Sequence, residues 1–239
     1  MTAAQEYGSG VGYQNEIQEL EVVLDYYKEI EFWRKTPVAK RPREPCEFYE
    51  WVEKKLKDAI WQGGIKTVVN FGSGYAYIDS RLAKAFPDTI FYAVDRSPLT
   101  KMFNTRVFSG QPNLLPVSWD IFNALQFTSG RSPRLLLTMR CLTLFPQDFV
   151  ERLYSAAYEA GFECVVSIEP NGRSEVTEEA YQFDAGRDHP SVPLYMGMNA
   201  HNYPGLMKQA GFVPECLGEI DTGLWNKWHR RVCWMGVRP

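Results

Sequence analysis

The segment that most restricts the fold is an apolar run that ends in a pair of glycines, at residues 67–76. It reads Thr-Val-Val-Asn-Phe-Gly-Ser-Gly-Tyr-Ala, and a helical segment and a second apolar run ending at Asp95 follow it. This order predicts a βαβ unit with the turn at the sheet edge where ligands bind. Gly72 and Gly74 let the backbone approach a ligand, and the start of the helix offers free N–H groups. Asp95 is placed to accept hydrogen bonds from both hydroxyls of a ribose.

Apolar and helical segments alternate through most of the chain. Continuous apolar strands separated by helices predict a parallel sheet that is covered on both faces. The last two strands are separated by a short loop, so we expect them to pair as an antiparallel hairpin at one edge of the sheet. The expected strands are 66–71, 89–94, 114–119, 134–139, 163–169, 212–220 and 231–237, and the expected helices are 47–61, 77–86, 98–108, 147–160 and 201–210.

Two segments fall outside this alternation. Residues 1–62 are expected to form an N-terminal helical cap or lid, with helices at 15–33 and 47–61 and a proline-rich charged linker between them. Residues 63–239 are expected to form the α/β domain. Within it, the polar residues 171–200 are predicted to be an insertion, because they interrupt the rhythm of strands and helices.

Composition argues against several classes of partner. The 239 residues carry a net charge of −3 and the isoelectric point is about 5.7. There is no basic field to hold a phosphate backbone, so we expect no nucleic-acid partner. The five cysteines are far apart and form no C-x-x-C pair, which disfavours a disulfide framework and a zinc site. With no signal-peptide pattern and no apolar run of membrane-spanning length, we expect a cytoplasmic protein without a membrane partner.

Five expected parallel strands, a late helix and a final hairpin together resemble the class I S-adenosylmethionine-dependent methyltransferases, over residues 65–237. The first motif of that family, two hydrophobic residues, an acid, a hydrophobic residue and G-x-G-x-G, falls on residues 68–76. The resemblance implies an α/β fold: a Rossmann-like seven-stranded sheet with a C-terminal antiparallel hairpin, here with an N-terminal helical cap. It also implies S-adenosyl-L-methionine as the cofactor. The residues that it implies for cofactor binding are Asn70, Gly72, Ser73, Gly74, Asp95, Arg96, Asp120, Ile121 and Met139.

Some of these positions have a second interpretation. Asp95 could cap the helix that begins at Pro98, alone or together with its ribose role, and Asp120, expected to contact adenine, could be a surface turn residue. Two positions depart from the family motif, because Asn70 replaces the usual acid and Ala76 replaces the third glycine. Asn70 can still accept a hydrogen bond, but the charge that would face the amino group of the cofactor is gone.

Dinucleotide-binding oxidoreductases share the strand, turn, helix, strand and acid. Tyr77 stands where the third glycine of their fingerprint would fall, and the terminal hairpin also favours the methyltransferase fold. A narrower resemblance concerns residues 167–170 and 201–206, which are similar to sugar O-methyltransferases of bacterial biosynthetic pathways.

Catalytic candidates are few. The chain has three histidines, and His201 heads the expected helix after the fifth strand, at the ligand-binding edge of the sheet. We therefore predict His201 as the base that removes a hydroxyl proton, with Tyr203 and Glu169 positioning the acceptor. The alternative is that His201 makes only structural hydrogen bonds. No tight acidic cluster surrounds Glu169, so no metal site is predicted.

The hypothesis from the sequence is a methyltransferase that acts on a small molecule, by O-methylation of a hydroxyl on a sugar-like or natural-product scaffold. N-methylation of a small amine remains an alternative. The loss of the acid at Asn70 motivates another, a protein that binds the cofactor without transferring methyl. The last alternative is a non-catalytic interaction module with this fold. The N-terminal helices could cap the site or form the contact of a homodimer.

Overall fold

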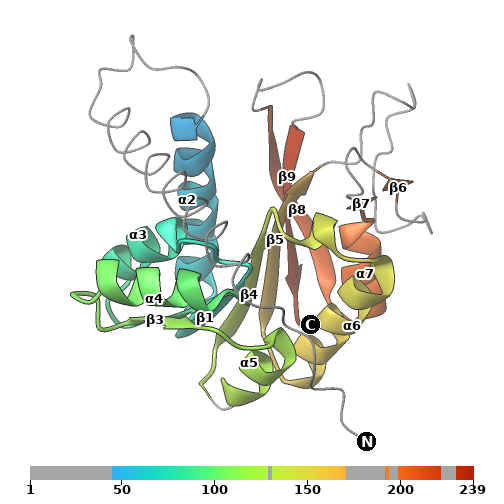
Figure 1. The fold of residues 1–239 in the computed structure, drawn as a ribbon. Coiled ribbons are helices and arrows are strands. Elements are labelled where there is room, and N and C mark those ends of the chain that lie inside the picture. Colours follow the sequence, from blue (N-terminus) through green and yellow to red (C-terminus); the bar gives the residue numbers. More distant parts are fainter. Residues whose placement is uncertain (1–44, 129–130, 171–191, 194–198, 222–229) are drawn as a thin grey trace, which may run out of the picture. The chain divides into compact units, whose positions relative to one another are not determined.

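The computed structural model describes residues 45–128, 131–170, 192–193, 199–221 and 230–239 (Figure 1). Its helices and strands alternate as expected, and most boundaries lie within one or two residues of those predicted. The helices are α2 (Pro45–Gln62), α3 (Tyr77–Ala85), α4 (Pro98–Val107), α5 (Ile121–Phe127), the 3-10 turn η2 (Leu142–Leu144), α6 (Gln147–Glu159) and α7 (Tyr203–Gln209). The strands are β1 (Thr67–Phe71), β2 (Ile90–Val94), β3 (Leu114–Val117), β4 (Arg134–Met139), β5 (Cys164–Pro170), β6 (Val192–Pro193), β7 (Asn199–Ala200), β8 (Val213–Asp221) and β9 (Arg230–Val237).

Seven of these strands form one sheet, in the order β3-β2-β1-β4-β5-β9-β8. The first five are parallel, and β9 pairs antiparallel with both β5 and β8. The chain order reverses direction at β1 and β4, and an open parallel sheet binds ligands beyond the carboxyl ends of its strands at such a point. The predicted seven-stranded sheet and its C-terminal antiparallel hairpin are confirmed.

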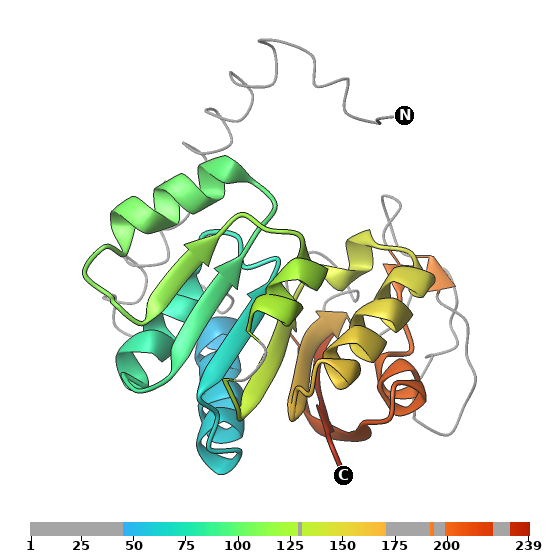
Figure 2. The same cartoon turned by 90° about the horizontal axis from the view of Figure 1, so that it is seen from below.

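The helices cover both faces of the sheet, and α5, α6 and α7 lie together on one of them (Figures 1 and 2). On that face Val69, Leu136 and Val165 of the sheet belong to one buried cluster with Leu153 of α6 and Met207 of α7. Burial of this apolar surface is the main stabilising term of the fold. It holds the carboxyl ends of β1, β4 and β5 in fixed register.

Two details of the predicted elements were wrong. The helix α5 was not expected, although Ile121, Ala124 and Leu125 follow the spacing of a buried helical face and are buried. His201 does not head the last helix. That helix begins at Tyr203, because Asn202 is its N-cap and accepts a hydrogen bond from Gly205 N at 3.2 Å.

The expected domain boundary can be compared only in part. Contacts divide the chain into the units Met1–Cys46 and Glu47–Pro239, so α2 belongs almost wholly to the second unit. The helix expected at 15–33 lies outside the described residues. Of the insertion 171–200, the structure describes only β6 and β7, which pair antiparallel.

Candidate active site

The carboxyl edge of the parallel strands gathers buried polar atoms that have no hydrogen-bond partner. Six side chains near this edge each leave one such oxygen: Asn70, Ser73, Asp79, Asn104, Glu169 and Tyr203. A buried polar atom without a partner is destabilising, so several together are typical of a place where a ligand or water completes the bonds. This edge is the candidate site.

The glycine turn after β1 is held against the end of β2. Gly72 N and Ser73 N donate to Val94 O at 2.9 and 3.1 Å. Gly72 has φ +71°, a conformation that favours glycine, and a Cβ at this position would lie 2.6 Å from the Cβ of Cys141. Both features require glycine at position 72, while the approach of a ligand to this turn stays a prediction.

Asp95 ties this turn to the end of β2. Its Oδ2 accepts from Gly74 N at 3.0 Å and its Oδ1 accepts from Ser97 N at 2.9 Å. The N-cap of α4 is Ser97, which accepts from Thr100 N at 3.3 Å, so the capping role considered for Asp95 is wrong. Each carboxylate oxygen of Asp95 still has acceptor capacity for a ribose hydroxyl.

The remaining predicted cofactor residues lie at the ends of β2, β3 and β4. Asp120 is exposed and is the N-cap of α5, where it accepts from Phe122 N at 2.9 Å. Ile121 is buried, and Met139 is half-buried at the end of β4. Arg96 is exposed beside Asp95. The edge therefore brings these positions together, while their contacts to a cofactor stay predictions.

Asn70 has a partner that the sequence analysis missed. Its Nδ2 donates to Oδ2 of Asp79 at 2.8 Å, and both side chains are buried. Burial raises the pKa of Asp79 to about 7, and the hydrogen bonds from Asn70 and from its own backbone amide act against this rise. A signal was present, because Asp79 shares a helical face with the apolar residues Leu82 and Ala83.

Glu169 occupies the end of β5, with 1% of its surface exposed. Its Oε1 accepts from Cys141 N and Leu142 N, each at 3.3 Å, whereas its Oε2 has no partner. Burial raises the pKa of this carboxyl to about 7, partly offset by the two backbone bonds and by the charges of Arg231 and Arg140. A carboxylate with a free oxygen and a pKa near neutrality can serve as a general base.

Cys141 connects the glycine turn with Glu169. Its N donates to Glu169, its Sγ donates to Phe71 O at 3.2 Å, and its Cβ lies under Gly72. Burial, together with the negative charges of Glu169 and Asp95, raises the pKa of the thiol well above its usual range. Cys141 is thus a neutral residue that contacts both Glu169 and Gly72. Only Cys141 lies between the candidate base, Glu169, and the turn that would hold a cofactor.

His201 is fully buried, which the sequence did not indicate. Its Nε2 lies 3.1 Å from both Leu142 O and Phe145 O. Carbonyls only accept, so Nε2 carries the proton and Nδ1 alone could receive another. Burial also lowers the pKa of His201, against the effect of these two bonds. The geometry favours the structural alternative, in which His201 fixes η2 and the backbone that binds Glu169.

Tyr203 lies beside this histidine, with ring centroids 5.6 Å apart in an edge-on arrangement. Its hydroxyl is buried and has no partner. Burial and the charge of Glu169 raise its pKa well above the usual value, so the phenol stays protonated. Tyr203 can therefore donate or accept a hydrogen bond next to Glu169, but it is not a base.

No group of three potential metal ligands occurs within the residues that the structure describes. Nor does any described helix have the length and apolar character needed to cross a membrane. Cys141, Cys164, Cys216 and Cys233 are free thiols.

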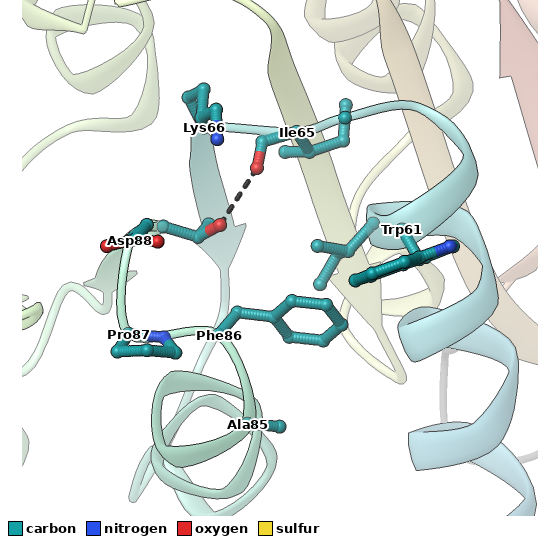
Figure 3. Close-up of a pocket in the computed structure, with 10 residues that line it drawn as sticks. Trp61, Ile65, Lys66, Ala85, Phe86, Pro87 and Asp88 are labelled. Carbon is teal, nitrogen blue, oxygen red and sulfur yellow. Dashed lines mark hydrogen bonds between the residues drawn. The ribbon is translucent and has the colours of Figure 1, made fainter.

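The opposite edge of the sheet carries an open pocket of about 310 Å³ (Figure 3). It lies between the end of α2, with Trp61, and the connection between α3 and β2, with Phe86 and Asp88. Thr89 Oγ1 donates to Ile65 O at 2.8 Å in its wall. Behind it, Asn113 Nδ2 lies 3.0 Å from Ala83 O, from Phe86 O and from Thr89 O. Other buried side-chain atoms at this edge have no partner, namely Oγ1 of Thr67 at the start of β1 and two guanidinium nitrogens of Arg134 at the start of β4.

Comparison with known proteins identifies the fold of this chain but matches no family model. No protein-family model matches the chain, and no curated protein matches it. Solved structures do. SibL, an S-adenosylmethionine-dependent methyltransferase, is 17% identical, with a TM-score of 0.56 over 80% of this chain and 56% of that one. The bifunctional kinase-methyltransferase WbdD is 14% identical, with a TM-score of 0.57 over 83% of this chain and 41% of that one.

A third structure is similar over most of both chains. It is magnesium protoporphyrin IX methyltransferase (ChlM) from Synechocystis PCC 6803 with bound SAH, 12% identical, with a TM-score of 0.55 over 81% of this chain and 82% of that one. The chain thus spans about half the length, or less, of SibL and WbdD. At these identities the likeness concerns the fold, and the chain has the fold of the class I S-adenosylmethionine-dependent methyltransferases.

Proposed function

We propose that this chain is an S-adenosylmethionine-dependent methyltransferase that methylates a hydroxyl of a small molecule on a sugar-like or natural-product scaffold. The observation that carries the proposal is the position of Glu169. A buried carboxylate with one unpaired oxygen is joined through Cys141 to a glycine turn at the ligand-binding edge of a methyltransferase fold.

The residues of the edge fit the proposed cofactor. Gly72 and Gly74 expose backbone, and Asp95 retains acceptor capacity on both oxygens for a ribose. Asp120 and Met139 are proposed to flank the adenine, with Arg96 and Ile121 beside them. The loss of the acid at Asn70 no longer argues for a protein that binds without transfer, since Asp79 brings a carboxylate to the same place.

When bound, S-adenosylmethionine would supply a methyl group carried on a sulfonium sulfur, and its leaving group is a neutral thioether. The protein must align the acceptor oxygen, exclude water and remove one proton. We assign the removal of the hydroxyl proton of the acceptor to Oε2 of Glu169. The hydroxyl of Tyr203 would hold the acceptor, and His201 would keep η2 and Glu169 in position.

The experiment combines binding with an acceptor screen. Calorimetric titration with S-adenosylmethionine and S-adenosylhomocysteine, with NADH as a control, tests the cofactor. Methylated products from hydroxyl and amine acceptors are then detected by mass spectrometry. If neither form of the cofactor binds, the proposal is wrong and the alternative of a non-catalytic interaction module is favoured.

The variant Glu169→Gln separates O-methylation from N-methylation. Gln keeps an oxygen for Cys141 N and Leu142 N but cannot take a proton. With a hydroxyl acceptor, kcat should fall by about 10²- to 10⁴-fold. An amine that offers a lone pair needs alignment only, so an unchanged rate in Glu169→Gln would favour N-methylation. Glu159→Gln, at an exposed position of α6, is the matched control.

The remaining expectations stay proposals. A small-molecule acceptor, a cytoplasmic location without nucleic-acid or membrane partners, and a homodimer formed by the N-terminal segment are each open to test. Sedimentation analysis of the full chain with and without residues 1–44 would test the last of these.

A further inference from the structure

The space below the glycine turn holds a cluster of polar side chains from three elements. Asn70 comes from β1, Asp79 from α3 and Asn104 from α4, and Ser73 belongs to the turn itself. Asn104 Nδ2 donates to Gly74 O at 2.8 Å, which fixes it against the turn. Each of the four leaves one oxygen without a hydrogen-bond partner. All four free atoms can accept a hydrogen bond, so the cluster is suited to a group rich in donors.

The bond between Asn70 and Asp79 fixes the orientation of the amide. When Asp79 is ionised, its carboxylate only accepts hydrogen bonds, and the Nδ2 of Asn70 then faces its Oδ2, as it does at 2.8 Å. The carbonyl Oδ1 of Asn70 is then turned away from Asp79, and both it and Oδ1 of Asp79 remain free. In its ionised form, Asp79 supplies a negative charge and also orients the free acceptor oxygen of Asn70.

The local structure explains why a carboxylate is tolerated at position 79. Ala76 has φ +51° and turns the chain into α3, so that Asp79 falls in the first turn of that helix. The positive end of a helix dipole stabilises a carboxylate there. Asp79 is nonetheless buried, with 1% of its surface exposed, and its only described side-chain partner is the neutral Asn70. A buried carboxylate whose only side-chain partner is neutral is costly unless a cation completes it.

We propose that Asn70 and Asp79 together bind the ammonium group of the cofactor, with Asp79 supplying the charge that the end of β1 lacks. This proposal rests on the proposed function, because that function supplies a ligand with an ammonium group. Asp79 acts as a positioning residue through Asn70 and as the counter-charge below the turn.

The test compares two ligands by calorimetry. S-adenosylhomocysteine carries the ammonium group, whereas 5′-methylthioadenosine has the same nucleoside and thioether but no amino-acid part. In Asp79→Asn, the dissociation constant for S-adenosylhomocysteine should rise about 10- to 100-fold, the usual effect of losing a charged hydrogen bond. Affinity for 5′-methylthioadenosine should be almost unchanged. Asp88→Asn, an exposed position at the other edge of the sheet, is the matched control.

The exchange of the two side chains is the decisive variant. Asn70→Asp combined with Asp79→Asn restores one carboxylate and one amide in contact, and it should recover most of the affinity for S-adenosylhomocysteine. Failure to recover, with a normal unfolding temperature, overturns the proposal. An equal loss for both ligands in Asp79→Asn also overturns it, because Asp79 would then only shape the turn. If the wild type binds neither ligand, the proposed function itself is wrong.

Discussion

The substitution Asp95→Asn separates the structural role of this carboxylate from its proposed role in binding. Asp95 accepts one backbone N–H on each oxygen, from Gly74 at 3.0 Å and from Ser97 at 2.9 Å. An amide has a single oxygen, so one of these N–H groups would face an NH₂ group and lose its acceptor. Within the described part of the chain, the Asp95 side chain makes these two hydrogen bonds and no others.

The size of both effects follows from these bonds. A hydrogen bond to a charged group contributes about 1.5–3 kcal/mol, and water can replace it in part at this half-buried position. We expect a loss of stability of about 1–2 kcal/mol and a fall in unfolding temperature of about 2–8 °C. Loss of a charged bond to a ribose hydroxyl should also weaken S-adenosylhomocysteine binding by about 10- to 100-fold.

The assay is calorimetric titration together with thermal unfolding. Asp120→Asn is the comparison, because Asn caps a helix as well as Asp does and α5 should keep its stability. Any loss of affinity in that variant therefore reports a contact with adenine. If Asp95→Asn lowers the unfolding temperature as expected but binds S-adenosylhomocysteine as tightly as the wild type, the ribose role of Asp95 is refuted.

Three further predictions concern the other residues of the edge. Glu169 must be ionised to act as the base, so kcat should rise with pH through about 7 and reach a plateau above it. The variant Glu169→Gln should abolish this rise. A kcat that falls as pH rises would contradict the assignment. Gly72→Ala should cost about 2–4 kcal/mol of unfolding free energy in urea titrations, since the new Cβ meets Cys141 and φ is +71°; adding Cys141→Gly should restore about half, and no recovery would exclude the clash as the cause. His201→Gln can still donate to both carbonyls, so turnover should stay within about tenfold of the wild type; a larger loss at normal stability would restore His201 as the base.

The fold was accessible from the sequence because its signals are local. Each parallel strand is a continuous apolar run bounded by turn residues, and the glycines at 72 and 74 mark the first connection. The helix α5, with seven residues, was not predicted, although α7 has the same length and was predicted.

The site was accessible only in part, since its chemistry depends on burial and on contacts across elements. Asp95 directly follows β2 and Glu169 lies at the end of β5, so the sequence pattern of apolar strands indicated both positions. The pairing of Asn70 with Asp79 links a strand to a helix, and only the acid on an apolar helical face hinted at it. His201 was expected to be available, but it is held by the carbonyls of Leu142 in η2 and of Phe145 directly after η2, 59 and 56 residues earlier in the chain.

The triple contact of Asn113 has a consequence for engineering this protein. One side chain holds the end of α3 and the start of β2 at the amino edge of the sheet. This edge lies opposite the candidate ligand site and contributes no residue to it. A library that randomises residues after β4 and β5 while leaving Asn113 and Thr89 intact should yield many folded members with altered acceptor preference. Randomising the amino edge instead should mostly yield insoluble chains.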